Sequence, residues 1–183
     1  MQCLCITFSA VERVIVKNLK RSIILLAVFL FCLSRIQGQI NVEVNAGIPT
    51  GEISDIYSMT FGINMYFMFA ESQDGLVNFG GTTGYIYYAD KFGGGGEFQD
   101  ASFIPVAGTA RIKVFKLINF GPDIGYAVAV DKPDLFEDYS GGFYWKLAAG
   151  IDVVKKIELN LFYHNIYAET TFATIGLGGL VKF

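Results

Sequence analysis

The sequence is short of charge and has no long apolar run. Of its 183 residues, 17% are charged and 52% are hydrophobic, whereas an average soluble domain has about 25% charged residues. The longest apolar run, residues 23–33, is shorter than the roughly 20 residues that a membrane helix needs. We therefore exclude a helical membrane protein. The 17 Phe, 10 Tyr and 1 Trp exclude a disordered chain, and the length predicts one domain.

Cysteine and basic residues are scarce as well. All three cysteines, Cys3, Cys5 and Cys32, precede residue 39. The rest of the chain can therefore form no disulfide, no cysteine metal site and no thiol nucleophile. The net charge is −3, and no basic run occurs after residue 21. This charge distribution argues against nucleic acid as a partner.

The first 38 residues are expected to be a leader rather than part of the fold. Basic residues at positions 17–21 precede the apolar run, and a short polar stretch then ends in the small residue Gly38. This order is typical of a secretory signal peptide. We predict a signal peptide over 1–38 that is cleaved after Gly38, and a single mature domain over 39–183.

Two details of the leader have further consequences. Residues 1–15 lie awkwardly in front of the basic segment, so we hypothesise that translation starts at Val16. The predicted mature chain keeps nine Lys and Arg against sixteen Asp and Glu, a net charge of −7. The mature protein is therefore more acidic than the whole sequence.

After residue 38, apolar and polar residues alternate with period 2, which is the pattern of β-strands. In residues 40–48, Ile, Val and Ala hold the even positions, and Asn, Glu and Gly hold the odd ones. Each predicted strand has about 9–13 residues, close to the 9–11 that a tilted strand needs to cross a bilayer. The strands are expected at roughly 40–48, 59–69, 76–88, 104–114, 118–130, 143–153, 157–167 and 172–183.

The connections between these strands alternate in length. Long polar connections are expected at 49–58, 89–103 and 131–142, and short ones at 70–75, 115–117 and 154–156. Long loops on one side and short turns on the other are the plan of an up-and-down outer-membrane barrel.

The two faces of the predicted strands differ in charge. One face carries no charged residue in any of the eight strands, and the other carries eight charges and many glycines. A lipocalin-like soluble barrel would bury the apolar face, whereas a membrane barrel turns it to lipid. The glycines favour the membrane barrel, because an eight-stranded barrel has a narrow interior. The predicted fold class is all-β: an up-and-down antiparallel eight-stranded transmembrane β-barrel after a cleaved signal peptide.

Four segments together carry a family resemblance. These are the opening strand Ile40–Ile48, the motifs Gly80–Tyr85 and Phe120–Tyr126, and the ending Gly176–Phe183. With the leader that ends before Gln39, they make 39–183 resemble the small outer-membrane β-barrel family of Gram-negative bacteria. The resemblance implies the fold and a location in the cell outer membrane. It also implies that Phe183 is the terminal signal that the outer-membrane assembly machinery reads. It implies no single activity.

The charges of the inward face are candidates for a site. Arg111, Lys113 and Asp123 meet across one short turn, and Glu43 and Lys182 lie on the first and last strands, which pair when the barrel closes. Because buried charges persist only when they are paired, we predict an ion-pair network that plugs the lumen. A selectivity filter is the alternative. The predicted network comprises Glu43, Arg111, Lys113, Asp123, Lys146, Asp152, Glu158 and Lys182.

Other chemistry has weaker support. His164, the only histidine, is expected in the lumen with a hydrogen-bond partner, because a hydrolase would need a serine beside it. The acidic segment 131–138 lacks the ligand spacing of a calcium loop. Residues 93–96 are four glycines without the Lys-Ser/Thr of a phosphate loop. We predict no enzymatic activity, no cofactor and no metal site.

The expected function follows from the location rather than from a catalytic motif. We expect a monomeric outer-membrane protein with a structural or surface-interaction role, acting through 49–58, 89–103 and 131–142. The expected partners are outer-membrane lipid, lipopolysaccharide and the assembly machinery. A narrow porin-like channel for small solutes or ions is the alternative function, and a membrane lipid-modifying enzyme is a third.

Overall fold

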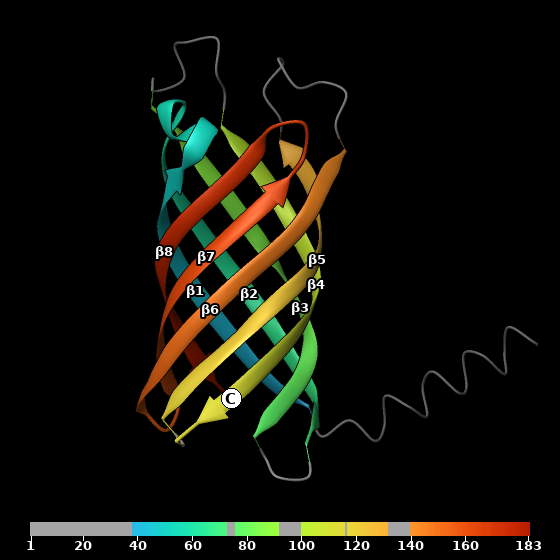
Figure 1. The fold of residues 1–183 in the computed structure, drawn as a ribbon, viewed down its shortest axis with the longest axis vertical. Coiled ribbons are helices and arrows are strands. Elements are labelled where there is room, and N and C mark those ends of the chain that lie inside the picture. Colours follow the sequence, from blue (N-terminus) through green and yellow to red (C-terminus); the bar gives the residue numbers. More distant parts are fainter. Residues whose placement is uncertain (1–37, 73–75, 92–99, 116, 132–139) are drawn as a thin grey trace, which may run out of the picture. The chain divides into compact units, whose positions relative to one another are not determined.

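The computed structural model describes residues 38–72, 76–91, 100–115, 117–131 and 140–183. The predicted leader lies outside this part of the chain except for Gly38. Eight antiparallel strands, each paired with the next and the last with the first, form a closed barrel (Figure 1). They are β1 (Gln39–Thr50), β2 (Tyr57–Glu71), β3 (Val77–Asp90), β4 (Ala101–Val114), β5 (Ile118–Asp131), β6 (Gly141–Val154), β7 (Ile157–Tyr167) and β8 (Thr171–Lys182).

All eight predicted strands are present, and their bounds differ from the predicted ones by at most three residues. The predicted fold class, an all-β up-and-down barrel, is confirmed. Closure pairs the backbone of every strand on both sides, so the barrel has no free edge.

Pro122 lies within β5 and causes no bulge there. Thr109 pairs with Asp123 and Ile112 pairs with Phe120, so the register is the same on both sides of the proline. The ladder between β4 and β5 omits only the two pairs in between. Pro122 still pairs with Leu147 on β6, and its missing N–H is accommodated without an extra residue.

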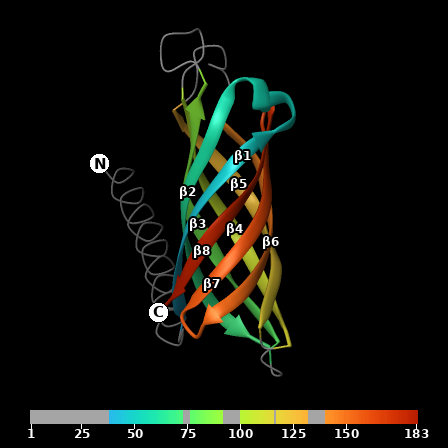
Figure 2. The same ribbon diagram turned by 90° about the vertical axis from the view of Figure 1, so that its left-hand side faces the viewer.

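The two ends of the barrel differ. At one end lie the start of β1, the end of β8 and the short connections, and we call this the turn end (Figures 1 and 2). The opposite end, which we call the loop end, carries a 3-10 helix, η1 (Gly51–Asp55). None of the helical segments in the described ranges is long and apolar enough to span a membrane.

The long polar connection predicted at 49–58 is shorter than expected and contains a 3-10 helix. Strand β1 continues to Thr50, and Gly51, whose φ is +73°, lets the chain turn into η1. The turn places Ile53 in the barrel interior, where it is 1% exposed. Burial of this apolar side chain explains why the segment folds back instead of extending.

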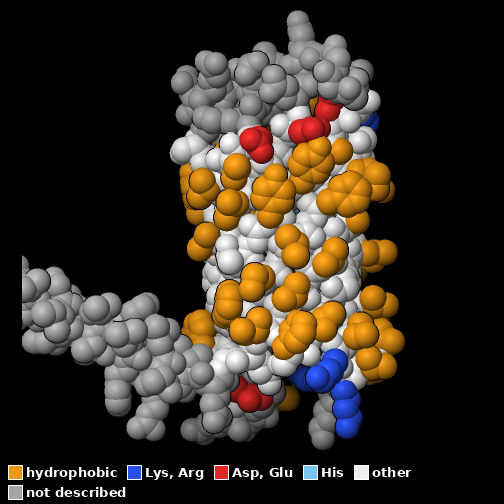
Figure 3. Space-filling view, turned by 180° about the vertical axis from the view of Figure 1, so that it is seen from behind, with side chains coloured by type: hydrophobic (Ala, Val, Ile, Leu, Met, Phe, Trp, Pro, Cys, Tyr) orange, Lys and Arg blue, Asp and Glu red, His pale blue; other side chains and the backbone are white. Residues whose placement is uncertain are grey.

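The outward face of the strands is apolar. Phe61, Val106 and Leu161 are 46%, 58% and 53% exposed, respectively. Figure 3 shows hydrophobic side chains around the middle of the barrel, with charged side chains only toward its two ends. Two residues assigned to this face, Asn165 and Ala173, are instead buried, since they pair with one another beside aromatic neighbours on β6 and β7.

Candidate functional site in the barrel interior

The interior of the barrel contains an ion pair that crosses the lumen. Glu43 on β1 and Lys146 on β6 form a salt bridge and are 0% and 1% exposed as side chains. Their strands are not neighbours in the barrel. Asn45 Nδ2 also donates to the Glu43 carboxylate at 2.9 Å, and Tyr66 OH lies 3.2 Å from it. A buried carboxylate is stable only with such compensation.

A second ion pair adjoins the first through a tyrosine. Arg111 Nη1 lies 2.7 Å from Asp123 Oδ1, and Thr109 Oγ1 donates to the same oxygen at 2.6 Å. Tyr66 OH lies 3.2 Å from Glu43 Oε2 and 3.3 Å from Asp123 Oδ2. Tyr66 therefore joins the two pairs, although its single proton can serve only one carboxylate at a time.

A third cluster lies nearer to solvent. Lys182 pairs with Asp152 and, at 2.7 Å, with Glu158 Oε2. Lys113 Nζ lies 2.9 Å from Asp152 Oδ2, and its side chain is 35% exposed. Asn119 Nδ2 donates to Asp152 and Glu158 at 2.9 and 2.7 Å. We call these three groups of ion pairs, with Tyr66 and the asparagines around them, the ionic half of the interior.

All eight charges that the sequence placed in the lumen take part in ion pairs. Their partners differ in one respect from those expected: Glu43 is paired with Lys146, and not with Lys182 on the adjacent strand. The register explains the difference, because Lys182 lies opposite Asn41 on β1. Lys182 instead contacts Asp152 and Glu158.

Glycines on the inward face make room for this network. A Cβ atom on Gly150 would lie 1.9 Å from Asn160 Oδ1 and 2.5 Å from Glu158 Oε1. One on Gly62 would lie 2.6 Å from Asn45 Oδ1. By contrast, outward-facing Gly179 has open space around its position.

The loop half of the interior is filled by apolar and aromatic side chains. Phe172 and Phe103 pack with ring centroids 4.9 Å apart, and Phe172 and Tyr88 with centroids 5.2 Å apart. Ile53 of η1 belongs to the same cluster. We call this group the aromatic half; it comprises Ile53, Tyr57, Ile86, Tyr88, Ala101, Phe103, Ala107, Ala127, Tyr144, Ile166 and Phe172.

Sequence reasoning missed this cluster. Its signal was available: near the loop end, strands β3 and β4 carry bulky residues in the inward phase, whereas toward the turn end the same strands carry glycine and charge. The change from small to large inward residues along a strand marks the position at which an interior becomes tightly packed.

His164 lies in the lumen, where the sequence placed it. It is 2% exposed, and its Nε2 atom lies 2.9 Å from Tyr88 OH. Thr174 Oγ1 donates to the same hydroxyl at 3.3 Å. The Ser102 hydroxyl donates to Asp131 Oδ2 at 2.7 Å. Residues 93–96 and 132–138 lie outside the described part of the chain, and within that part no cluster of metal-ligating side chains occurs.

The barrel is similar to solved transmembrane barrels. The outer membrane protein Ail of Yersinia pestis, solved in a phospholipid bilayer nanodisc, superposes with a TM-score of 0.56 at 11% identity, over 80% of this chain and 100% of that chain. A de novo designed transmembrane β-barrel gives 0.52 at 16% identity, over 80% and 96%. The designed barrel TMB2.3 gives 0.52 at 12% identity, over 80% and 94%. No protein-family model and no curated protein matches the sequence.

At these identities the likeness concerns the fold. The closed eight-stranded barrel, its apolar exterior and these neighbours define the class: the chain has the fold of the small eight-stranded outer-membrane β-barrels. The fold expected from the resemblance is thus confirmed.

Proposed function

We propose that the protein is a monomeric barrel of the cell outer membrane with a closed lumen, without enzymatic activity, and with a structural or surface-interaction role. The uncharged outward face supports the membrane location, since a Lys or Arg at mid-membrane would cost about 2–4 kcal/mol. Terminal Phe183, whose backbone N–H donates to Ile40 O at 3.1 Å, is proposed as the signal read by the assembly machinery.

The proposal of a closed lumen rests on one observation: side chains fill both halves of the barrel interior. The fully buried Glu43–Lys146 pair spans the ionic half, and the rings of Tyr88, Phe103 and Phe172 fill the aromatic half. An eight-stranded barrel has room for little more than its own side chains. A closed lumen leaves the exterior and the loop end as the surfaces on which partners bind.

The loop end is acidic. Its described connecting segments and their flanks carry six acidic residues and one lysine. The acids are Glu52, Asp55, Asp90, Asp100, Asp131 and Glu169, and the lysine is Lys91. A surface of this charge attracts cationic partners and repels polyanions. Lipopolysaccharide phosphates would approach it through divalent cations.

One carboxylate at this end is held in place by hydrogen bonds. Asp100 accepts the backbone N–H of Asp90 at 2.9 Å and the hydroxyl of Tyr87 at 2.6 Å. These hydrogen bonds lower the pKa of Asp100 below its ordinary value. Asp100 therefore remains ionised in mildly acidic conditions and keeps the loop end negative.

Two measurements test the proposal. The protein should sediment with outer membranes and resist extraction without detergent. On gels in dodecyl sulfate it should migrate anomalously until it is boiled, since an intact barrel unfolds only on heating. Recovery in a soluble fraction would contradict the membrane location.

Planar-bilayer recordings test the closed lumen. We expect no large, stable conductance from the purified barrel. A steady ohmic conductance would favour the alternative function, a narrow channel for small solutes or ions. A change in lipid A mass that depends on the protein and is lost in the His164→Ala variant would instead favour a lipid-modifying enzyme.

A further inference from the structure

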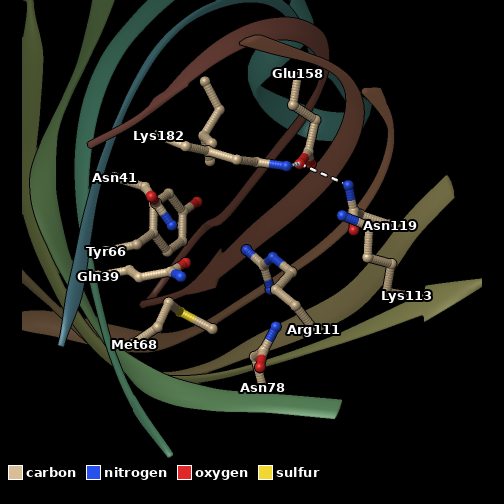
Figure 4. Close-up of a pocket in the computed structure, with 11 residues that line it drawn as sticks. Gln39, Asn41, Tyr66, Met68, Asn78, Arg111, Lys113, Asn119, Glu158 and Lys182 are labelled. Atoms are coloured by element: carbon tan, nitrogen blue, oxygen red, sulfur yellow. Dashed lines mark hydrogen bonds and ion pairs between the residues drawn. The ribbon is translucent and has the colours of Figure 1, made fainter. Parts of the chain in front are cut away.

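The turn end of the barrel contains a cavity of about 100 Å³. Figure 4 shows the residues that line it, with Lys182 and Asn119 both bonded to Glu158. A water molecule takes about 30 Å³ in the liquid, so the cavity has room for about three waters or for one small chemical group. The polar residues of its wall are Gln39, Asn41, Tyr66, Asn78, Arg111, Lys113, Asn119, Glu158 and Lys182.

Only one of the three guanidinium nitrogens of Arg111 donates hydrogen bonds to described residues. Its contacts with Asp123 Oδ1, Ala110 O and Pro122 O all come from Nη1. Nη2 and Nε donate to none of the residues that the structure describes. In Figure 4 the guanidinium points toward the middle of the ring of lining residues. Three N–H donors of a rigid fork therefore remain for another acceptor.

Three cations, each already in an ion pair, and one acid belong to the wall. Arg111, Lys113 and Lys182 line the cavity, and Glu158 is the acidic residue of the lining. Asp123 and Asp152, which pair with these cations, do not line it. Exposed Lys155 and Lys156 are in the β6–β7 turn at the same end.

A second group of the wall is also left without a partner. Asn41 is 8% exposed, and no hydrogen bond in the described structure reaches its buried Oδ1 atom. Buried polar atoms without partners are rare in proteins and mark places where water or a ligand completes the structure. The cavity wall is therefore polar on two counts: the Asn41 acceptor suits a water molecule, and the donor fork of Arg111 suits an anion.

We infer that this cavity binds a carboxylate group, held by Nη2 and Nε of Arg111 in the planar, two-pronged geometry that guanidinium and carboxylate share. The volume admits the carboxylate and its first carbon atoms. The ligand is either a small free carboxylate or the carboxy-terminal end of a peptide that enters from the turn end.

Binding to the folded barrel in a neutral detergent tests the inference. The probes are ¹³C-labelled acetate and N-acetyl-dialanine, observed by NMR titration, with N-acetyl-dialanine amide as the uncharged control. We expect saturable binding of at least one carboxylate and none of the amide. Tighter binding of acetate identifies a free small carboxylate, and tighter binding of the dipeptide identifies a peptide end. Absence of saturable carboxylate binding, or equal binding of the amide, overturns the inference.

Three variants locate the site. Arg111→Met should weaken carboxylate binding at least tenfold. Because this variant also removes the partner of Asp123, Asn78→Trp provides a second test: it fills the cavity while every charged residue is kept, and it should abolish binding. Lys155→Met removes a cation from the same end outside the cavity and should leave binding within twofold. Wild-type affinity in the folded Asn78→Trp variant would overturn the inference.

Discussion

The two halves of the interior fill the same barrel with opposite chemistry. In the ionic half, Glu43 is held by Lys146, Asn45 and Tyr66, each at a defined atom. In the aromatic half, Phe172 contacts several rings, and none of these contacts depends on a single atom. Charges in low dielectric require particular partners, whereas apolar groups require only volume. The ionic half should therefore be specific and intolerant of substitution, and the aromatic half should tolerate substitutions that conserve volume.

The largest effect is expected from Lys146→Met. The substitution leaves the Glu43 carboxylate buried without its counter-ion, which costs about 3–5 kcal/mol. Urea unfolding of the barrel in lipid vesicles, followed by gel mobility, measures the loss. In the double variant Lys146→Met and Glu43→Gln, no unpaired charge remains, and most of the stability should return. A double variant as unstable as the single one would show that the pair is not the stabilising unit.

The next effect concerns the aromatic half. Phe172→Ala removes a ring that is 1% exposed, and the cavity left behind should destabilise the barrel by about 3 kcal/mol. Phe172→Leu keeps most of the volume and should lose less than half as much. The same unfolding assay compares the two variants. If Phe172→Leu is as damaging as Phe172→Ala, ring geometry rather than volume holds this half together, and the contrast with the ionic half disappears.

This contrast also shows what the sequence could reveal. Strand positions and inward phase were predictable because alternation with period 2 is local, as in 40–48. The partner of Glu43 was not predictable, because Lys146 is 103 residues away and lies on a strand that is not hydrogen-bonded to β1. Such a contact depends on the diameter of the barrel and on the shear between its strands. The burial of Ile53 likewise depends on how η1 turns back toward the barrel interior. The alternation of apolar and polar residues in the sequence does not predict this turn.

Glycine substitutions separate the crowded interior from the open exterior. Gly150→Ala places a Cβ 1.9 Å from Asn160 Oδ1, so both side chains must shift, at a cost of about 1–3 kcal/mol. Gly179→Ala has no atom within 4 Å of the new carbon and should be neutral or stabilising by less than about 1 kcal/mol. Unfolding midpoints of the two variants test the difference. Equal effects would mean that the inward glycines serve backbone geometry rather than the fit of the polar network.

The smallest loss within the ionic half is expected at its outer edge. Lys113 is 35% exposed as a side chain, and its partner Asp152 also contacts Lys182. Lys113→Met removes a partly solvated pair without leaving a lone buried charge, so the loss should be about 0.5 kcal/mol. High salt should reduce this loss further and leave the effect of Lys146→Met nearly unchanged. If Lys113→Met costs as much as Lys146→Met, depth does not set the strength of these pairs, and the ion pairs act as one cooperative network.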